Sequence, residues 1–150
     1  MRDASACWNA KAYRSPDRVT GTNLKGMMMT KVAINRCFGG FGISDEAFEL
    51  LLTRKGYAFD KVVSEGTSRL MGPSYYHAGL PHIDDNYINE YEFYENRSDP
   101  DLIFVIEQMR DKADSWAAEI AIIEIPDDVK WHISEYDGLE HVAEDHRTWF

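Results

Sequence analysis

The amino-acid sequence predicts a single α+β domain, with a mainly antiparallel sheet and two helices packed on one of its faces. Three observations support this fold class. Two stretches repeat apolar residues at the spacing of an amphipathic helix, and several short runs alternate apolar and polar residues as strands do. The dipeptide Asp137-Gly138, between two such runs, is typical of a tight turn that joins antiparallel strands. A chain of 150 residues is long enough for one domain with a core, and short for two.

The first strand and the first helix are expected at residues 31–37 and 44–55, with a glycine-rich turn at 38–42 between them. Ser44 is a typical N-cap, because its hydroxyl can accept from backbone N–H groups of the first turn. Residues 57–63 are the second expected strand. The buried stripe expected on this helix consists of Ala47, Phe48, Leu51 and Leu52.

The middle of the chain predicts a long loop, a strand and the second helix. Glycine and proline residues break any period over residues 64–86, and a loop of that length is functional or mobile. Residues 87–94 alternate well enough to predict a strand. Asp99 followed by Pro100 predicts the start of a helix, since aspartate caps and proline fits the first helical position; this helix is expected to end near 112–114.

Three further strands are expected near the C-terminus. Residues 119–125 are a β-branched run with apolar side chains on both faces, which predicts a central strand. Residues 129–134 alternate, and residues 140–149 are the expected return strand and tail after the Asp137-Gly138 turn.

Residues 1–29 differ from the rest, and the domain is expected to span residues 30–150. The first segment has no sustained helical or strand periodicity, and its net charge is +3. Because the whole chain has a net charge of −10, residues 30–150 carry −13. One interpretation is a flexible basic arm that docks on an acidic surface, including that of a second copy in a homo-oligomer. The other, slightly favoured, is that translation starts not at Met1 but at one of three methionines where the patterned sequence begins: Met27, Met28 or Met29.

The net charge of −10 argues against direct nucleic-acid binding, which normally requires a basic face. It favours high solubility, a basic protein partner or imitation of a nucleic acid's charge. No apolar stretch reaches the length of a membrane span. Cys7 and Cys37 lack the spacing of a disulfide framework, which indicates a reducing compartment, and the protein is expected to be cytoplasmic.

The glycine-rich turn is the first candidate site. A strand, a glycine-rich turn and a helix N-terminus in succession can direct backbone N–H groups at an anion. The run matches neither the P-loop nor the dinucleotide fingerprint, Asp45 and Glu46 would repel an anion, and a purely structural turn is the alternative. No cofactor is expected. The candidate ligand-binding residues are Asn35, Arg36, Gly39, Gly40, Gly42 and Ser44.

Two other candidates concern catalysis. Cys37 follows Arg36 and could have a lowered thiol pKa, but no base is close in sequence, and a buried structural cysteine is the preferred interpretation. No catalytic residue is therefore assigned. A polar cluster near the C-terminus could bind a divalent metal ion, although its spacing matches no strong zinc pattern and an exposed polar face explains it equally well. Its candidate ligands are His132, His141, His146 and Glu144.

Several blocks of the sequence resemble a family of small phage and prophage proteins. They are VAINRCFGGFGISDEA at 32–47, EIPDDVKW at 124–131, EYDG at 135–138 and HRTW at 146–149, and the helix start at Ser98 is similar too. The resemblance covers residues 31–63 and 97–149; the segment before Met29 has no counterpart, and residues 64–96 depart most. It implies a cytoplasmic accessory protein made during infection or lysogeny of a bacterial host.

These inferences lead to one expected function and two alternatives. The expected function is a non-enzymatic phage accessory protein that binds and neutralises a host defence factor, with a host protein or a small nucleotide signal as its partner. The alternatives are an acidic inhibitor that imitates nucleic acid and blocks a host nuclease, and a small metal-dependent hydrolase.

Overall fold

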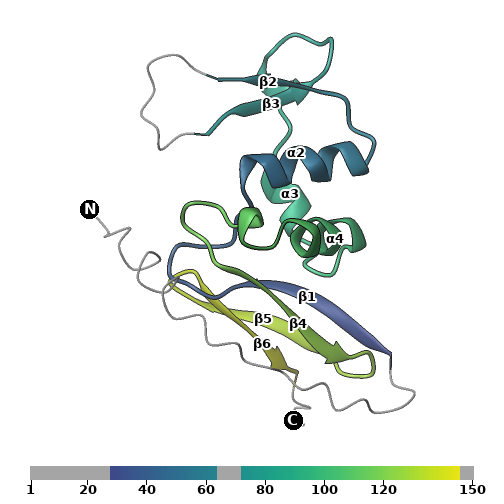
Figure 1. Cartoon of the computed structure of the whole chain (residues 1–150), viewed down its shortest axis with the longest axis vertical. Coiled ribbons are helices and arrows are strands. Elements are labelled where there is room, and N and C mark those ends of the chain that lie inside the picture. The colour runs from purple at the N-terminus through teal and green to yellow at the C-terminus, as the bar shows by residue number, and fades with distance from the viewer. Residues whose placement is uncertain (1–27, 64–71, 146–150) are drawn as a thin grey trace, which may run out of the picture.

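The computed structural model describes residues 28–63 and 72–145, whose elements stack in three levels along the long axis of the molecule (Figure 1). One strand hairpin lies at one end, the helices lie in the middle, and four strands lie at the other end. The α+β class and the antiparallel pairing are confirmed. In chain order the elements are β1 (Met29–Asn35), α2 (Asp45–Arg54), β2 (Phe59–Val62), β3 (Ser74–His77), the 3₁₀ turn η1 (Asp84–Asn86), α3 (Glu90–Tyr94), α4 (Pro100–Met109), the 3₁₀ turn η2 (Arg110–Ala113), β4 (Ile120–Pro126), β5 (Trp131–Tyr136) and β6 (Leu139–Glu144).

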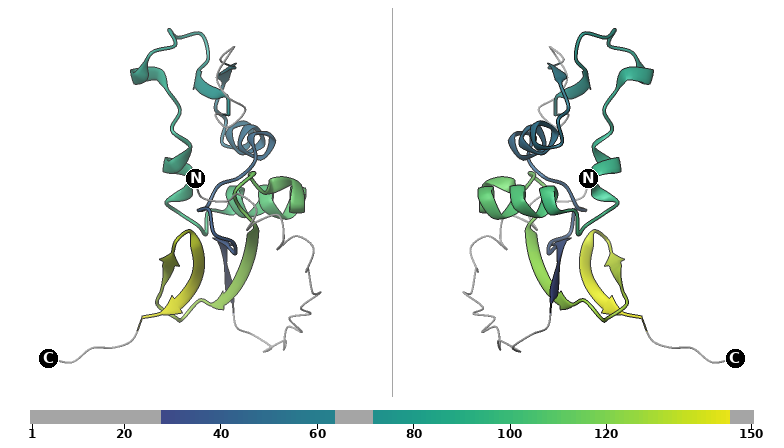
Figure 2. Two further views of the ribbon diagram at one scale, coloured as in Figure 1. Left: turned by 90° about the vertical axis from the view of Figure 1, so that its left-hand side faces the viewer. Right: turned by 90° about the vertical axis from the view of Figure 1, so that its right-hand side faces the viewer.

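The described strands form three two-stranded antiparallel sheets, β1–β4, β2–β3 and β5–β6. The β5–β6 hairpin lies against the β1–β4 ribbon, with β6 in contact with β1 (Figure 2). No backbone ladder joins the hairpin to the ribbon; the backbone N–H of Asn35 in β1 instead donates to the side chain of Glu140 in β6 at 2.8 Å.

The β1–β4 ribbon buries apolar side chains on both faces. Ala33 and Ile120 lie on the face that joins the core beneath the helices. Val32 and Ile34 are buried on the opposite face and are not part of that core cluster. Side chains alternate along a strand, so this split follows directly from the sequence of β1.

Helices α2 and α4 begin where the sequence predicts and supply most of the core. The hydroxyl of Ser44 accepts a hydrogen bond from the backbone N–H of Ala47 at 3.3 Å. The carboxylate of Asp99 accepts from the backbone N–H groups of Asp101 and Leu102 at 2.9 and 3.0 Å, with Pro100 at the first helical position. The largest fully buried apolar side chains, three of them in α2, are Phe48, Leu51, Leu52, Leu102, Val32 and Val105.

The predicted turn at Asp137-Gly138 is confirmed. Both residues have positive φ, 49° at Asp137 and 87° at Gly138, and they connect paired residues Tyr136 and Leu139. Positive φ at both central positions defines a type I′ turn, which matches the natural twist of a two-stranded hairpin.

The strand predicted at 87–94 is wrong. Residues 90–94 form the short helix α3, in which the Asn89 side chain accepts a hydrogen bond from the backbone N–H of Tyr91 at 3.2 Å. The neighbouring residues Phe93 and Tyr94 both pack into the core, which one face of a strand would not allow. Strand β3 lies inside the loop predicted at 64–86, since the glycines and prolines around it hide a run of only four residues.

Part of the sequence lies outside the described residues. This holds for residues 1–27 of the predicted arm and for residues 146–150; of the arm, Met28 and Met29 are described, and Met29 is the first residue of β1. Among the helices described, none combines the length and the apolar character needed to cross a membrane.

Candidate functional site

Asn35, at the end of β1, lies in the interior and has no exposed surface. Its side-chain NH₂ group donates to the carbonyl oxygens of Cys37 and Gly138, both at 2.7 Å, and its side-chain oxygen accepts from the backbone N–H of Glu119 at 2.9 Å. Other groups of the protein therefore occupy the NH₂ donors and the oxygen acceptor of the Asn35 side chain. The structure gives Asn35 a structural role in place of the predicted contact with a ligand.

A buried ion pair adjoins Asn35. The guanidinium of Arg97 binds both carboxylate oxygens of Glu140, at 2.8 and 3.0 Å, and one of these oxygens also accepts from the backbone N–H of Asn35 at 2.8 Å. Arg97 lies over the ring of Phe41, 3.6 Å from its centroid. The ion pair thereby joins the segment before α4, the glycine-rich turn, β1 and β6. No sequence signal identified it, because Arg97 and Glu140 are far apart and neither belongs to a motif.

The glycine-rich turn is closed on one side by close backbone contacts. A Cβ atom at Gly39 would lie 2.2 Å from the carbonyl oxygen of Ala117, and one at Gly138 would lie 2.3 Å from the backbone nitrogen of Gly40. Glycine is required at these positions because the two backbones touch. The turn is thus packed against the tip of the β5–β6 hairpin.

The other predicted ligand-binding residues divide into two groups. Ser44 caps α2 and its hydroxyl donates to the carbonyl oxygen of Lys112 at 2.6 Å, so its hydrogen bonds are internal. Arg36 is exposed and donates through its backbone N–H to Glu119. Gly39, Gly40 and Gly42 line a cleft whose described lining does not include the other three predicted residues.

This cleft has a volume of about 570 Å³, and no residue of the β5–β6 hairpin is among the described residues that line it. The glycine-rich turn, the start of α2, the segment entering β3, the start of α3 and the turn before β4 enclose it. We call it the acidic cleft, since the described residues of its lining include two carboxylates and no Lys, Arg or His. It is lined by residues 39–43, 45, 72–75, 87–88, 90–91 and 115–117.

The two carboxylates belong to Asp45 and Glu90. Burial raises the pKa of Glu90, and the nearby charge of Asp45 raises it further. Partial enclosure of its carboxyl group also raises the pKa of Asp45, an effect that Lys61 opposes. An anion entering this cleft would be repelled, whereas a cation would relieve the mutual repulsion of the two groups.

Aromatic rings surround the carboxylates. Tyr75 forms part of the buried wall, and its hydroxyl donates to Glu49 at 3.0 Å; burial, followed by this hydrogen bond, raises the pKa of Tyr75. Trp116 and Tyr91 lie at the rim with 66% and 67% of their surface exposed. Exposed rings beside carboxylates are suited to hold a cation, because the face of a ring attracts positive charge.

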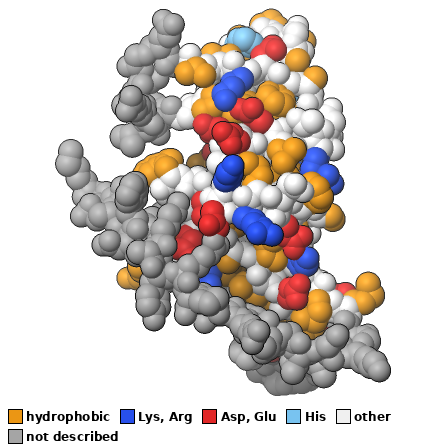
Figure 3. All heavy atoms as spheres, in the orientation of Figure 1, with side chains coloured by type: hydrophobic (Ala, Val, Ile, Leu, Met, Phe, Trp, Pro, Cys, Tyr) orange, Lys and Arg blue, Asp and Glu red, His pale blue; other side chains and the backbone are white. Residues whose placement is uncertain are grey.

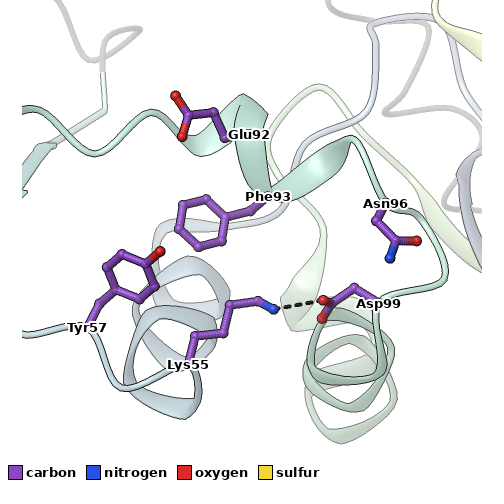
Figure 4. Close-up of a pocket in the computed structure, with 6 residues that line it drawn as sticks. All are labelled: Lys55, Tyr57, Glu92, Phe93, Asn96 and Asp99. Carbon is purple, nitrogen blue, oxygen red and sulfur yellow. Dashed lines mark hydrogen bonds and ion pairs between the residues drawn. The ribbon is translucent and has the colours of Figure 1, made fainter.

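A second, smaller pocket of about 260 Å³ lies between α2 and the start of α4 (Figure 4). Lys55 points at Asp99, and their charged atoms are 2.7 Å apart. Burial raises the pKa of Asp99, but the hydrogen bonds from Lys55 and from the backbone of Leu102 outweigh it, so the pKa of Asp99 is lowered. The groups in this pocket satisfy one another and stabilise the helix start.

The predicted metal ligands do not converge. His132 and His141 lie on facing strands and on the same face of the β5–β6 hairpin, as expected. Glu144 pairs with Trp131 and therefore points from the opposite face, and His146 lies outside the described residues. His132 is bound to Asp145, with 2.5 Å between the two side chains. Within residues 28–63 and 72–145, no three His, Cys, Asp or Glu side chains are placed to hold a metal ion.

Cys37 is buried and disulfide-bonded. It therefore presents no thiolate nucleophile, which agrees with the structural interpretation of this residue.

Comparison of the chain with protein-family models, with curated proteins and with solved structures gives no match. The resemblance to small phage and prophage proteins thus stays a prediction from the sequence blocks.

Proposed function

We propose that this protein is a non-enzymatic phage accessory protein that binds and neutralises a host protein through the acidic cleft. The observation that carries the proposal is the composition of the cleft: two carboxylates, exposed rings at the rim, and no basic residue among the described residues that line it. Such a surface is complementary to a basic protein segment.

The same composition disfavours the nucleotide form of this function. A nucleotide signal carries phosphate groups, and the glycine N–H groups that could receive them share the cleft with Asp45 and Glu90. Both carboxylates would lie near the phosphates without a cation to compensate them. A protein partner therefore fits the cleft better than a nucleotide.

Imitation of nucleic acid receives no support from the face that Figure 3 shows. Basic and acidic side chains are interspersed over the helical level of that face. Three ion pairs in this level are Lys55–Asp99, Arg54–Asp101 and Lys61–Glu49. A mimic requires an uninterrupted row of negative charge, and paired acids do not provide one.

The proposal is tested by expressing the protein in bacterial strains that carry different phage defences, and by measuring the plating efficiency of restricted phages. We expect wild-type protein to raise plating efficiency on at least one strain. A variant without the rim rings, Trp116→Ala with Tyr91→Ala, should lose this effect, because it loses exposed contact area. Tyr136→Ala is the matched control, since Tyr136 is 78% exposed and lies at the end of β5, outside the lining.

Two results would contradict the proposal: no change in plating on any strain, or equal protection by the rim variant and wild type. A separate measurement tests the nucleotide form. Cyclic nucleotides and ADP-ribose derivatives should leave the melting temperature of the protein unchanged. A shift with any of them would show that the ligand is a nucleotide and contradict the proposed protein partner.

A further inference from the structure

We propose that the acidic cleft binds an arginine or lysine side chain of the partner polypeptide, with the cationic group between Asp45 and Glu90 and the rings of Trp116 and Tyr91 beside it. This inference deepens the proposed function, and rests on it for the statement that the cation belongs to a protein. The contact chemistry itself is argued from the cleft.

Glu90 is a half-buried residue of the cleft lining. It has one hydrogen-bond partner among the described residues, the Tyr94 hydroxyl, which donates to its Oε2 at 3.5 Å. Half-buried acids elsewhere in the helical level have a cation: Glu49 pairs with Lys61 and Asp99 pairs with Lys55, both at 2.7 Å. Glu90 therefore has the enclosure of a paired acid without a basic partner from the described chain.

Asp45 lines the same cleft. Its carboxylate accepts no hydrogen bond from the described residues, and its negative charge acts on Glu90. Two nearby carboxylates repel each other unless a positive charge compensates them, and a guanidinium can donate to both because it carries five N–H groups. Lys61, whose charge acts on Asp45, is ion-paired with Glu49, so a cation in direct contact with both Asp45 and Glu90 has to come from outside the described residues.

The rim of the cleft carries two exposed aromatic rings. Trp116 and Tyr91 line the cleft and are about two-thirds exposed, an unusual degree for large rings. A ring face that covers a cation adds to its binding, more strongly when water is excluded. The cleft volume of about 570 Å³ exceeds the size of one side chain, so the backbone of a bound segment can enter with it.

The test uses the full-length protein, labelled with ¹⁵N, and two blocked tripeptides, acetyl-Gly-Arg-Gly-amide and its citrulline counterpart. Citrulline has the shape of arginine without the charge. The signal is the indole N–H of Trp116, assigned with a Trp116→Phe variant. We expect the arginine peptide to shift this signal saturably in the millimolar range, and the citrulline peptide to bind about tenfold more weakly.

Matched variants locate the contact. Glu90→Gln should weaken the arginine peptide about tenfold, because it removes the enclosed charge. Glu92→Gln removes an equal charge from the same helix but outside the cleft, so binding should stay within about twofold of wild type. The fold of each variant is checked by the dispersion of the same spectra.

Any of three results overturns the inference: no saturable shift with the arginine peptide, equal binding of the citrulline peptide, or unchanged binding by Glu90→Gln. Tighter peptide binding after Arg14→Gln with Arg18→Gln would overturn the assignment to a partner, since the chain's own basic segment would then be the occupant. Failure here is distinct from failure of the proposed function: a plating effect without peptide binding removes only this inference, and peptide binding without a plating effect removes the function.

Discussion

Arg97 and Glu140 form the central polar contact among the described residues, because four segments meet at this one ion pair. The Glu140 side chain is 7% exposed and that of Arg97 is 15% exposed, so neither charge is well solvated. A buried pair is costly to break, since removal of one partner leaves the other charged and uncompensated.

A double-mutant cycle measures the coupling between Arg97 and Glu140. Arg97→Met and Glu140→Met should each lower the free energy of unfolding by about 3 kcal/mol, while the double variant should lose at least about 1 kcal/mol less than the sum. Urea unfolding measures all four proteins. The control cycle uses Arg54 and Asp101, an ion pair whose side chains are 36% and 33% exposed, where each change should cost within about 1 kcal/mol. Additive losses at Arg97 and Glu140 would show that the pair does not act as a unit.

At this scale the sequence predicted the helix caps Ser44 and Asp99 and the glycines of the turn, since each depends on its sequence neighbours alone. It did not predict that Asn35 is buried. The groups that surround Asn35 come from Glu119, Gly138 and Glu140, more than 80 positions away along the chain. A strand ending in a polar residue looks the same in sequence whether that residue faces a ligand or the interior.

At the scale of elements, β4 shows how an apolar run can be interpreted correctly in one respect and incorrectly in another. Apolar side chains on both faces predicted a central strand, and the β1–β4 ribbon does bury apolar side chains on both faces. The step from burial on both faces to a central strand was wrong, because burial says nothing about hydrogen bonding at the edges. β4 pairs with β1 alone among the described strands.

The contact between the β5–β6 turn and the glycine-rich turn gives a second prediction. Gly138→Ala places a Cβ 2.3 Å from the backbone nitrogen of Gly40 at a φ of 87°, so it should lower the free energy of unfolding by about 3 kcal/mol. Gly79→Ala is the matched control, since Gly79 has a φ of 75° and open space around its Cβ position. It should cost about 1 kcal/mol, the conformational penalty alone. Equal losses in thermal or urea unfolding would mean that the two turns do not touch in solution.

At the scale of the whole molecule, burial is uneven between the two ends. The last four residues of β1 are buried, whereas β2 contains no buried residue and β3 only Tyr75. The β2–β3 hairpin lies beside the helices at the end of the molecule, and β1 of the β1–β4 ribbon contacts both α4 and β6. The end that carries β2 and β3 should therefore open more readily.

Hydrogen exchange of the unmodified protein tests this gradient. We expect the hydrogen-bonded amides of β1 and β4 to exchange roughly a hundredfold more slowly than those of β2 and β3, as expected for local opening of a less covered unit. Both ladders are hydrogen-bonded, so each serves as the control for the other. Equal protection at the two ends would show that the molecule opens only as one unit.

The bond between the Asn35 side chain and the carbonyl oxygen of Gly138 spans 103 positions. A ribosome that has just completed β1 and the glycines after it has more than ninety residues still to add before the tip of β5–β6 exists. The wall behind these glycines is therefore among the last parts of the molecule to be assembled during synthesis. Until Gly138 has been added, the side-chain NH₂ group of Asn35 lacks the carbonyl oxygen to which it donates across the two turns.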